Sequence, residues 1–404
     1  MIFQNIATVA GEKIDLHIDD GNNAIVAASH LLALPARLDP HVHFRTPGLE
    51  HKENWTTGAQ AAINGGCTMV FDMPNTLPPT ITEETLIAKK VLIDSQLTDA
   101  NIPLRYRLFI GADKQHLDQL AKVKHQVIGI KVFMGCSTGN LVIDDDESLH
   151  AVFEIAAKEK MIVAVHAEDE ALMCARKPYF QDENNYACHS EIRNVEVATR
   201  AVEKAIQLAK HYGAKLYVLH VSTMEEIALI KTAKTEGVNV YAETTPHHLF
   251  FNTDAYLALG GKAVVNPPLR ESIHQPALWQ AIKEGVIDTI GSDHAPHTLM
   301  EKNKKYGECP SGMPGIEFVL PLLFTALKQG KISLEKIVDL TAKRAREIFD
   351  ITETNEDWVL VDPHLTAKVE KTASKCGWSP YMGLKLTGWP QYTVMRGKVY
   401  ALKN

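Results

Sequence analysis

Residues 161–166 read Met161-Ile-Val-Ala-Val-His166, a short run in which only the last residue is polar. Parallel strands that are covered by helices on both faces have this nearly continuous apolar character. Seven other short runs along the chain have a similar character, and we predict that all eight are strands. The eight runs are residues 36–43, 68–72, 105–110, 128–134, 161–166, 216–221, 238–243 and 287–292.

Segments with helical periodicity separate these runs. Apolar residues between Leu149 and Ala156 recur at positions i, i+3, i+4 and i+7, the spacing of a helix that buries one stripe. The segment from Ala201 to Ala209 has the same spacing, and Gly213 follows it where a helix would end. Eightfold alternation of strand and helix predicts an α/β fold of the (β/α)8 TIM barrel type. A doubly wound open sheet is the alternative, but no GxGxxG motif follows any of the strands.

The two ends of the chain have a different pattern. Residues 1–35 contain the alternating run Lys13-Ile-Asp-Leu-His-Ile, and residues 357–404 contain Trp358-Val-Leu-Val and Tyr392-Thr-Val-Met. Such runs are typical of short strands in antiparallel sheets. We therefore expect residues 1–35 and 357–404 to pair into one small β module beside a barrel formed by residues 36–356.

Composition narrows the class of protein. The 404-residue chain carries 42 Lys and Arg against 49 Asp and Glu, and this balance of −7 argues against a general binder of nucleic acid or of anionic membranes. The six cysteines form no CxxC pair, so neither a zinc ribbon nor a disulfide framework is indicated. The sequence contains neither a secretory signal pattern nor an apolar run of 18 residues, and we expect a cytoplasmic protein.

The first predicted strand ends in His41-Val-His43. Residues two apart in a strand project to the same side, so both imidazoles can reach one metal ion. Taken alone, the motif is a weak signal, because two core or surface histidines are the more frequent explanation.

Other predicted strands end in side chains of the same kind. Lys131 interrupts the apolar fourth run, His166 ends the fifth, His220 lies at the end of the sixth, and Asp293 follows the eighth. The carboxyl ends of the strands form the active site in barrels of this type. Five strands that each bring a ligand-type group to one rim predict a metal site.

Lys131 needs a separate explanation, because an ammonium group repels a divalent cation. Reaction with CO2 would convert the amine into a carbamate, an anionic ligand that can bridge two metal ions. A lysine paired with a nearby carboxylate is the simpler interpretation of a buried lysine. The surrounding histidines favour the carbamate.

At this point the sequence resembles a known family. The order HxH, Lys, His, His, Asp resembles the amidohydrolase superfamily, and the local motifs resemble the dihydroorotase family. The resemblance covers most of the chain from about residue 36. The matching stretches are DPHVHFRTPGL (39–49), FDMPNT (71–76), IKVFMG (130–135), ETTPHHL (243–249), VNPPLR (265–270) and GSDHAPH (291–297).

The resemblance implies a site with two divalent metal ions, expected to be zinc. His41, His43 and Asp293 would hold one ion, His166 and His220 would hold the other, and carboxylated Lys131 would bridge them. Two further histidines, His247 and His248, would have supporting roles, because the six residues just named already fill the ligand positions.

The resemblance also implies a substrate site. Arg45, Asn75 and His297 would bind a substrate carboxylate and neighbouring polar atoms, and Asn266 would contact the ring. Gly312 matches a substrate-contacting position, although the preceding residue is Ser311 where some relatives have Phe. Residues 301–315 match a flexible loop of the family.

These assignments imply a dihydroorotase, which interconverts L-dihydroorotate and N-carbamoyl-L-aspartate in pyrimidine biosynthesis. A hydroxide held between the two metal ions would attack the ring carbonyl, with Asp293 as general acid and base. Hydantoinases and allantoinases share the metal ligands but lack Arg45, which suits a carboxylated substrate.

A hydantoinase or allantoinase remains the first alternative, and a non-catalytic scaffold of the dihydroorotase type is the second. The family further implies a homodimer that acts on a small molecule, with a carbamoyltransferase as a candidate partner.

Overall fold

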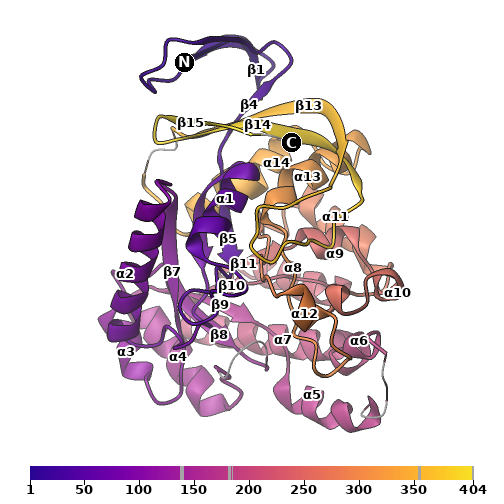
Figure 1. The fold of residues 1–404 in the computed structure, drawn as a ribbon. Helices are drawn as coiled ribbons and strands as arrows, with labels where there is room; N and C mark the ends of the chain where they lie inside the picture. Colours follow the sequence, from indigo (N-terminus) through magenta and orange to yellow (C-terminus); the bar gives the residue numbers. More distant parts are fainter. Residues whose placement is uncertain (137–140, 181–182, 184, 354–355, 403–404) are drawn as a thin grey trace.

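The computed structural model of the chain describes residues 1–136, 141–180, 183, 185–353 and 356–402. Residues 403 and 404 of the predicted β module lie outside the described residues. The remainder consists of a parallel barrel, the helices around it and a second sheet at one end of the molecule (Figure 1).

Eight parallel strands form the barrel in their sequence order, as predicted. An isolated bridge between Val42 and His294 connects the first strand to the segment after the last, and the backbone N–H of His43 donates to the carbonyl of His294 at 2.8 Å. The sheet is therefore nearly closed. The strands are β5 (Arg37–Val42), β6 (Cys67–Asp72), β7 (Arg105–Gly111), β8 (Gly129–Phe133), β9 (Ile162–His166), β10 (Lys215–Val218), β11 (Val240–Thr244) and β12 (Thr289–Ile290).

One long helix follows most of the strands, and shorter helices decorate the loops. The predicted helix that ends before Gly213 is confirmed, because Gly213 caps it in the left-handed conformation. The principal helices are α1 (Trp55–Asn64), α2 (Glu83–Asp99), α3 (Leu117–Lys122), α4 (Asp146–Glu159), α7 (Val195–Tyr212), α8 (Met224–Thr235), α11 (His274–Glu284) and α13 (Val319–Lys328). The shorter ones are α5 (Glu170–Arg176), α6 (Cys188–Ile192), α9 (Pro246–Phe250), α10 (Ala255–Leu259), α12 (Leu299–Lys302), α14 (Leu334–Val338) and α15 (Arg344–Ile348).

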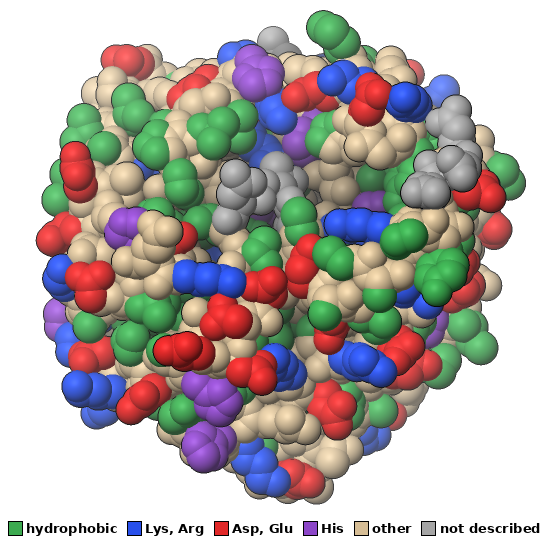
Figure 2. All heavy atoms as spheres, turned by 90° about the horizontal axis from the view of Figure 1, so that it is seen from below, with side chains coloured by type: hydrophobic (Ala, Val, Ile, Leu, Met, Phe, Trp, Pro, Cys, Tyr) green, Lys and Arg blue, Asp and Glu red, His purple; other side chains and the backbone are tan. Residues whose placement is uncertain are grey.

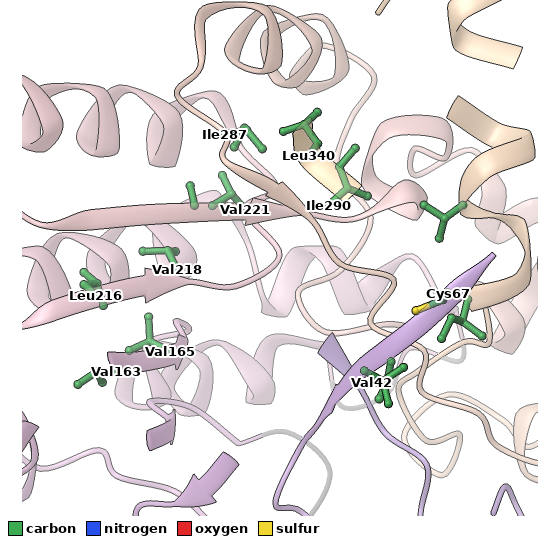
Figure 3. Close-up of a cluster of buried hydrophobic side chains, with 14 of the residues drawn as sticks. Val42, Cys67, Val163, Val165, Leu216, Val218, Val221, Ile287, Ile290 and Leu340 are labelled. Carbon is green, nitrogen blue, oxygen red and sulfur yellow. The ribbon is translucent and has the colours of Figure 1, made fainter. Parts of the chain in front are cut away.

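Both faces of the barrel strands are buried, which explains their continuous apolar sequence. Val163 and Val165 of β9 pack outward with residues of the surrounding helices (Figure 3). Ile162 and Ala164 belong to a separate inner cluster to which Tyr217 of β10 also contributes. Because alternate residues share a face, His166 continues the inward series of Ile162 and Ala164 and projects toward the barrel interior.

The segment after the last barrel strand fills the amino-terminal end of the barrel. Phe349, just beyond α15, packs edge-on against Phe71 and Tyr217, with ring centroids 5.1 and 5.0 Å away. The ammonium of Lys215 also donates to the carbonyl of Ile348. This apolar plug fills one end of the barrel and leaves the polar side chains to the other.

The two chain ends form one seven-stranded sheet, as predicted, with the order β15-β14-β13-β4-β1-β2 and with β3 also paired to β1. The sheet is mixed, because β1 pairs in parallel with both β3 and β4 while the other pairings are antiparallel. The chain reaches those two strands by crossing back after β2, so they run in the direction of β1. The antiparallel pairing of β4 with β13 joins the two termini. The strands are β1 (Ile2–Thr8), β2 (Lys13–His17), β3 (Ile25–Ala27), β4 (Leu32–Pro35), β13 (Trp358–Lys368), β14 (Lys385–Met395) and β15 (Lys398–Ala401).

The surface seen from the side away from the terminal sheet carries acidic and basic side chains interspersed with apolar ones (Figure 2). None of the helices in the described ranges combines the length and the apolar character that a membrane span requires.

Replacement of Gly388 by alanine is expected to destabilise the fold by about 2–4 kcal/mol. Gly388 lies in β14 with φ +83°, and a Cβ atom there would stand 2.1 Å from Cβ of Phe324 in α13. Gly383 has a similar φ of +86°, but the nearest atom to its Cβ position is 3.9 Å away. Gly383→Ala should therefore cost only about 1–2 kcal/mol in urea denaturation. Equal free energies of unfolding for the two variants would refute the packing argument.

Candidate active site

A small polar cavity lies where the barrel strands end. Nearly all the side chains singled out in the sequence line this one cavity, although they come from eight separate segments. The predicted residues in its wall are His41, His43, Arg45, Asn75, Lys131, His166, His220, Asn266, Asp293 and Gly312. The remaining one, His297, contacts Arg45 at the edge of the cavity.

His41, His43 and Asp293 form a compact cluster in which one ligand atom from each lies within 4.8 Å of the others. Oδ1 of Asp293 is 3.3 Å from Nε2 of His41 and 3.1 Å from Nε2 of His43. The HxH motif of β5 and the residue after β12 meet because the first and last strands are adjacent in the closed barrel. Two imidazole nitrogens and a carboxylate oxygen are a donor set that suits a divalent metal ion such as zinc.

His166 and His220 form a second pair beside the first cluster. Nδ1 of His166 lies 2.9 Å from Nε2 of His220, and the ring of His220 is 5.5 Å from that of His41. Within the described residues, Nδ1 of His220 is buried without a hydrogen-bond partner. An unsatisfied buried nitrogen is costly, which suggests that this pair is built for a ligand.

Lys131 projects from β8 into the same cavity and is 1% exposed. Its ammonium lies 4.6 Å from the centre of the Phe133 ring. Burial lowers the pKa of Lys131 to about 7, although the charges of Asp293 and Glu243 oppose this shift. A substantial fraction of the side chain is therefore a neutral amine at physiological pH, the form that can react with CO2.

Burial also sets the charge of the first cluster. Loss of hydration lowers the pKa of His41 and of His43 to about 4, so both rings are neutral near pH 7. Burial alone would raise the pKa of Asp293, but the adjacent His41 and His43 hold it below its ordinary value. Neutral imidazoles beside an ionised carboxylate are the protonation states that metal binding requires.

Two carboxylates orient the histidines, and the sequence interpretation gave them no role. Oε1 of Glu243 lies 2.8 Å from Nδ1 of His41, and Oε2 of Glu168 lies 2.8 Å from Nε2 of His166. Such contacts select the tautomer of a ligand histidine and fix its ring. A signal was available in both cases: Glu243 lies in β11 near its carboxyl end, and Glu168 follows His166 by two residues.

The residues present fit a divalent metal ion on these observations. The His41–His43–Asp293 cluster and the His166–His220 pair each present donor atoms toward a common space, and each contains a histidine oriented by a carboxylate. Lys131 lies between carboxylates and imidazoles and has the low pKa that would permit its conversion to an anionic ligand.

A cationic group lies beside this donor set. Arg45 is 2% exposed, and burial lowers its pKa to about 10, so it keeps its charge at neutral pH. Its Nε donates to the carbonyl of Pro296 at 3.1 Å, and one terminal nitrogen lies 3.1 Å from Nε2 of His297. Asn75 also lines the cavity, and its Oδ1 lies 2.8 Å from Nδ1 of His43. A buried guanidinium of this kind can bind a carboxylate through two hydrogen bonds.

Glycine is required at position 312. Gly312 has φ +136°, and a Cβ atom would stand 2.5 Å from the carbonyl oxygen of Ala295 and 3.2 Å from Cδ2 of His297. The loop that carries Ser311 and Gly312 therefore lies directly against the histidine at the edge of the cavity.

Two further histidines make hydrogen-bond contacts near the cavity. Nε2 of His189 lies 2.8 Å from Oδ1 of Asn266 and orients that amide, a contact that no spacing in the sequence indicated. His248 bonds to Thr245 and to the carbonyl of Pro267, as expected for a supporting residue.

Three residues of the site have a strained backbone. Arg45, His220 and Asp293 have φ angles of +64°, +40° and +43°, values that side chains other than glycine rarely adopt. Strained residues of this kind persist where the surrounding structure holds them for a purpose. Here the three residues with this backbone conformation all line one cavity.

Comparisons with known proteins agree with this geometry. Residues 32–355 match a family model described as the amidohydrolase family. The dihydroorotase of Carboxydothermus hydrogenoformans is 35% identical over 400 residues, which cover 96% of this chain and 90% of that protein. The multifunctional protein CAD of Squalus acanthias is 32% identical over 96% of this chain and 15% of its own length.

Solved structures give the same family. The L-hydantoinase (dihydropyrimidinase) of Arthrobacter aurescens superposes with a TM-score of 0.92 over 100% of this chain and 96% of its own, at 26% identity. With a family model that spans most of the sequence, the chain belongs to the amidohydrolase family and is a hydrolase that acts on a cyclic amide.

Proposed function

We propose that this protein is a dihydroorotase, which interconverts L-dihydroorotate and N-carbamoyl-L-aspartate in the synthesis of pyrimidines. The observation that carries the proposal is the buried guanidinium of Arg45 in the wall of the cavity that holds the predicted metal ligands. A cyclic amide with an attached carboxylate would place its charge on Arg45 and its reactive carbonyl beside the histidines. Homology to dihydroorotases at about one-third identity supports this substrate.

In this proposal His41, His43 and Asp293 hold one divalent ion, while His166 and His220 hold a second, with Lys131 between them as a carbamate. Divalent cations in such a site lower the pKa of water toward neutrality and polarise a carbonyl group. The chain provides neutral imidazoles as ligands, and Glu243 and Glu168 keep two of those rings in the required tautomer.

Asp293 is the candidate for proton transfer. Its carboxylate is ionised because His41 and His43 lower its pKa, and its strained backbone directs it into the cavity. It would accept the proton of the attacking water and deliver it to the amide nitrogen that leaves when the ring opens. In the reverse direction it would take a proton from the carbamoyl nitrogen and return it to departing water.

The carboxylate-binding residues would fix the ring for this step. Arg45 would pair with the substrate carboxylate, and Asn75 and His297 would donate to the same group or its neighbours. Asn266, oriented by His189, would contact the ring from the loop after β11. Holding the scissile carbonyl near Asp293 in this way reduces the entropic cost of the reaction.

Conversion of Lys131 to methionine is expected to remove at least one of the two metal ions and to lower turnover by more than about 100-fold. Methionine preserves the apolar stem but forms no carbamate. Metal analysis of the variant, with Lys398→Met as an exposed control, gives the direct readout. Labelling the wild-type protein with 13C-bicarbonate should produce a carbamate signal that the variant lacks. Full metal content in the variant would refute a bridging role for Lys131.

One experiment distinguishes a dihydroorotase from the two alternatives, a hydantoinase and a non-catalytic scaffold. Metal content is measured together with turnover of L-dihydroorotate, N-carbamoyl-L-aspartate, hydantoin and dihydrouracil. Two metal ions per chain and turnover of the two carboxylated compounds are the expected result. Preference for the uncarboxylated rings would favour a hydantoinase, the class of the Arthrobacter structure. Absence of metal and turnover after addition of zinc and bicarbonate would favour a scaffold.

We also propose that residues 36–356 form the catalytic barrel, that the protein is a homodimer, and that a carbamoyltransferase is a candidate partner. The relationship to CAD, a protein named as multifunctional, supports the last of these. Light scattering of the purified protein, alone and with the transferase, tests both associations.

A further inference from the structure

His297 is fully buried and has close polar neighbours on both ring nitrogens. The ammonium of Lys52 lies 3.1 Å from Nδ1. On the other side of the ring, a terminal nitrogen of Arg45 lies 3.1 Å from Nε2 and the carbonyl oxygen of Ser311 lies 3.0 Å from the same atom. The position of the imidazole proton therefore decides which of these contacts are hydrogen bonds.

The contacts with Lys52 and with the carbonyl of Ser311 both favour a proton on Nε2, whereas the contact with Arg45, which can also only donate, opposes it. An ammonium group has three donors and no acceptor, so Lys52 can only donate, and Nδ1 of His297 must accept. The proton of a neutral ring then resides on Nε2, where the carbonyl oxygen of Ser311 lies 3.0 Å away and a second acceptor could share the same N–H in a bifurcated hydrogen bond. Burial and the nearby charges of Arg45 and Lys52 hold the pKa of His297 well below its ordinary value, which keeps the ring neutral.

Glu301 holds Lys52 in place as an ammonium. Oε1 of Glu301 lies 2.9 Å from Nζ of Lys52, and Lys52 is 8% exposed. The other oxygen of Glu301 accepts 2.9 Å hydrogen bonds from the backbone and hydroxyl of Thr298 at the start of α12. Glu301 lies too far from Nδ1 of His297, at 4.0 Å, to accept a proton from that nitrogen.

We propose that Lys52 is a positioning residue that fixes His297 in the Nε2–H tautomer, so that His297 and Arg45 both present donors to the substrate carboxylate. In this tautomer the N–H of His297 Nε2 and an N–H of Arg45 lie 3.1 Å apart and repel each other. An anion that accepts a hydrogen bond from both groups would remove this repulsion. Without Lys52, a proton on Nδ1 would turn the Nε2 lone pair toward Arg45. His297 would then oppose a carboxylate instead of binding it.

The identity of the anion rests on the proposed function, whereas the tautomer does not. Nitrogen-15 labelling of the histidines and two-bond proton–nitrogen NMR of the metal-loaded enzyme report the tautomer directly, and His297→Gln identifies the signal. The expected result is an Nε2–H pattern for His297 in the wild type and in Lys52→Arg. Lys52→Met should shift the population toward Nδ1–H. An Nδ1–H pattern in the wild type overturns the proposal, even if Lys52→Met does not fold, and so does an unchanged tautomer in Lys52→Met.

Kinetics test the consequence for the substrate. Lys52→Met should raise KM for L-dihydroorotate at least about tenfold with a much smaller change in kcat, because it weakens a charge-assisted hydrogen bond. Lys52→Arg should restore most of the affinity, and the exposed Lys304→Met serves as a control with wild-type values. A fall in kcat alone, with KM unchanged, would overturn the binding role. If dihydroorotate is not a substrate at all, the proposed function fails while the NMR result still decides the role of Lys52.

Discussion

Replacement of Asp293 by asparagine is expected to lower kcat for both directions of the proposed reaction by about 10²–10⁴-fold. The carboxylate lies 3.1–3.3 Å from two imidazoles at the centre of the cavity and is ionised there. An amide of the same size cannot accept and return the proton. The comparison is made at equal metal content, so that a lost ligand is not mistaken for lost proton transfer.

The variant should fold, because asparagine tolerates the left-handed conformation that Asp293 adopts at φ +43°. Asp288→Asn is a matched control at the other end of the same strand. Asp288 pairs with Lys234 and Arg344 away from the cavity, so this control should lose stability but keep its turnover. Retention of more than a tenth of the wild-type kcat by Asp293→Asn would contradict its assignment.

Replacement of Arg45 by glutamine is expected to lower kcat/KM for L-dihydroorotate by roughly 30- to 5,000-fold, the equivalent of about 2–5 kcal/mol for a buried charge partner. The guanidinium is 2% exposed and still charged, so a carboxylate that it binds is shielded from water. Metal content should not change, because Arg45 faces His297 and Pro296 and is not a predicted ligand.

The decisive quantity is the ratio of kcat/KM for dihydroorotate to that for dihydrouracil, which lacks the carboxylate. Arg45→Gln should reduce this ratio, while a general structural fault would lower both values together. Arg396→Gln is the matched control, because Arg396 is exposed and also has a positive φ, of +51°. An unchanged ratio in Arg45→Gln would assign the carboxylate to another residue.

The barrel could be predicted from the sequence because its determinants are local. The continuous apolar character of a run such as residues 161–166 gives the strand, and the alternating direction of side chains along a strand puts His166 on the inner face. The strand boundaries were predicted less well: β12 comprises only Thr289–Ile290, and the next residue after it that forms a β-bridge with a barrel strand is His294, opposite Val42. The parallel pairings of β1 were missed, since a crossover leaves no periodic pattern.

Much of the site could also be predicted, since its main side chains follow strands whose ends must converge. What could not be predicted depends on contacts between distant segments. Lys52 and His297 are 245 positions apart, and Phe349 reaches the barrel interior from a helix outside it. The contact of His189 with Asn266 is likewise a product of packing. Such partners are set by three-dimensional closure of the barrel and not by spacing along the chain.

The terminal sheet has a consequence for how this enzyme can be joined to others. The first and last described strands, β1 and β15, belong to one sheet, and β4 leads from that sheet into the start of β5 (Figure 1). The cavity is lined by residues at the other, carboxyl ends of the barrel strands. Linkers attached at both ends would therefore leave from the same side of the molecule and keep clear of the substrate entrance. The architecture is thus suited to incorporation in a longer polypeptide, and CAD, of which the matching stretch makes up 15%, is such a polypeptide.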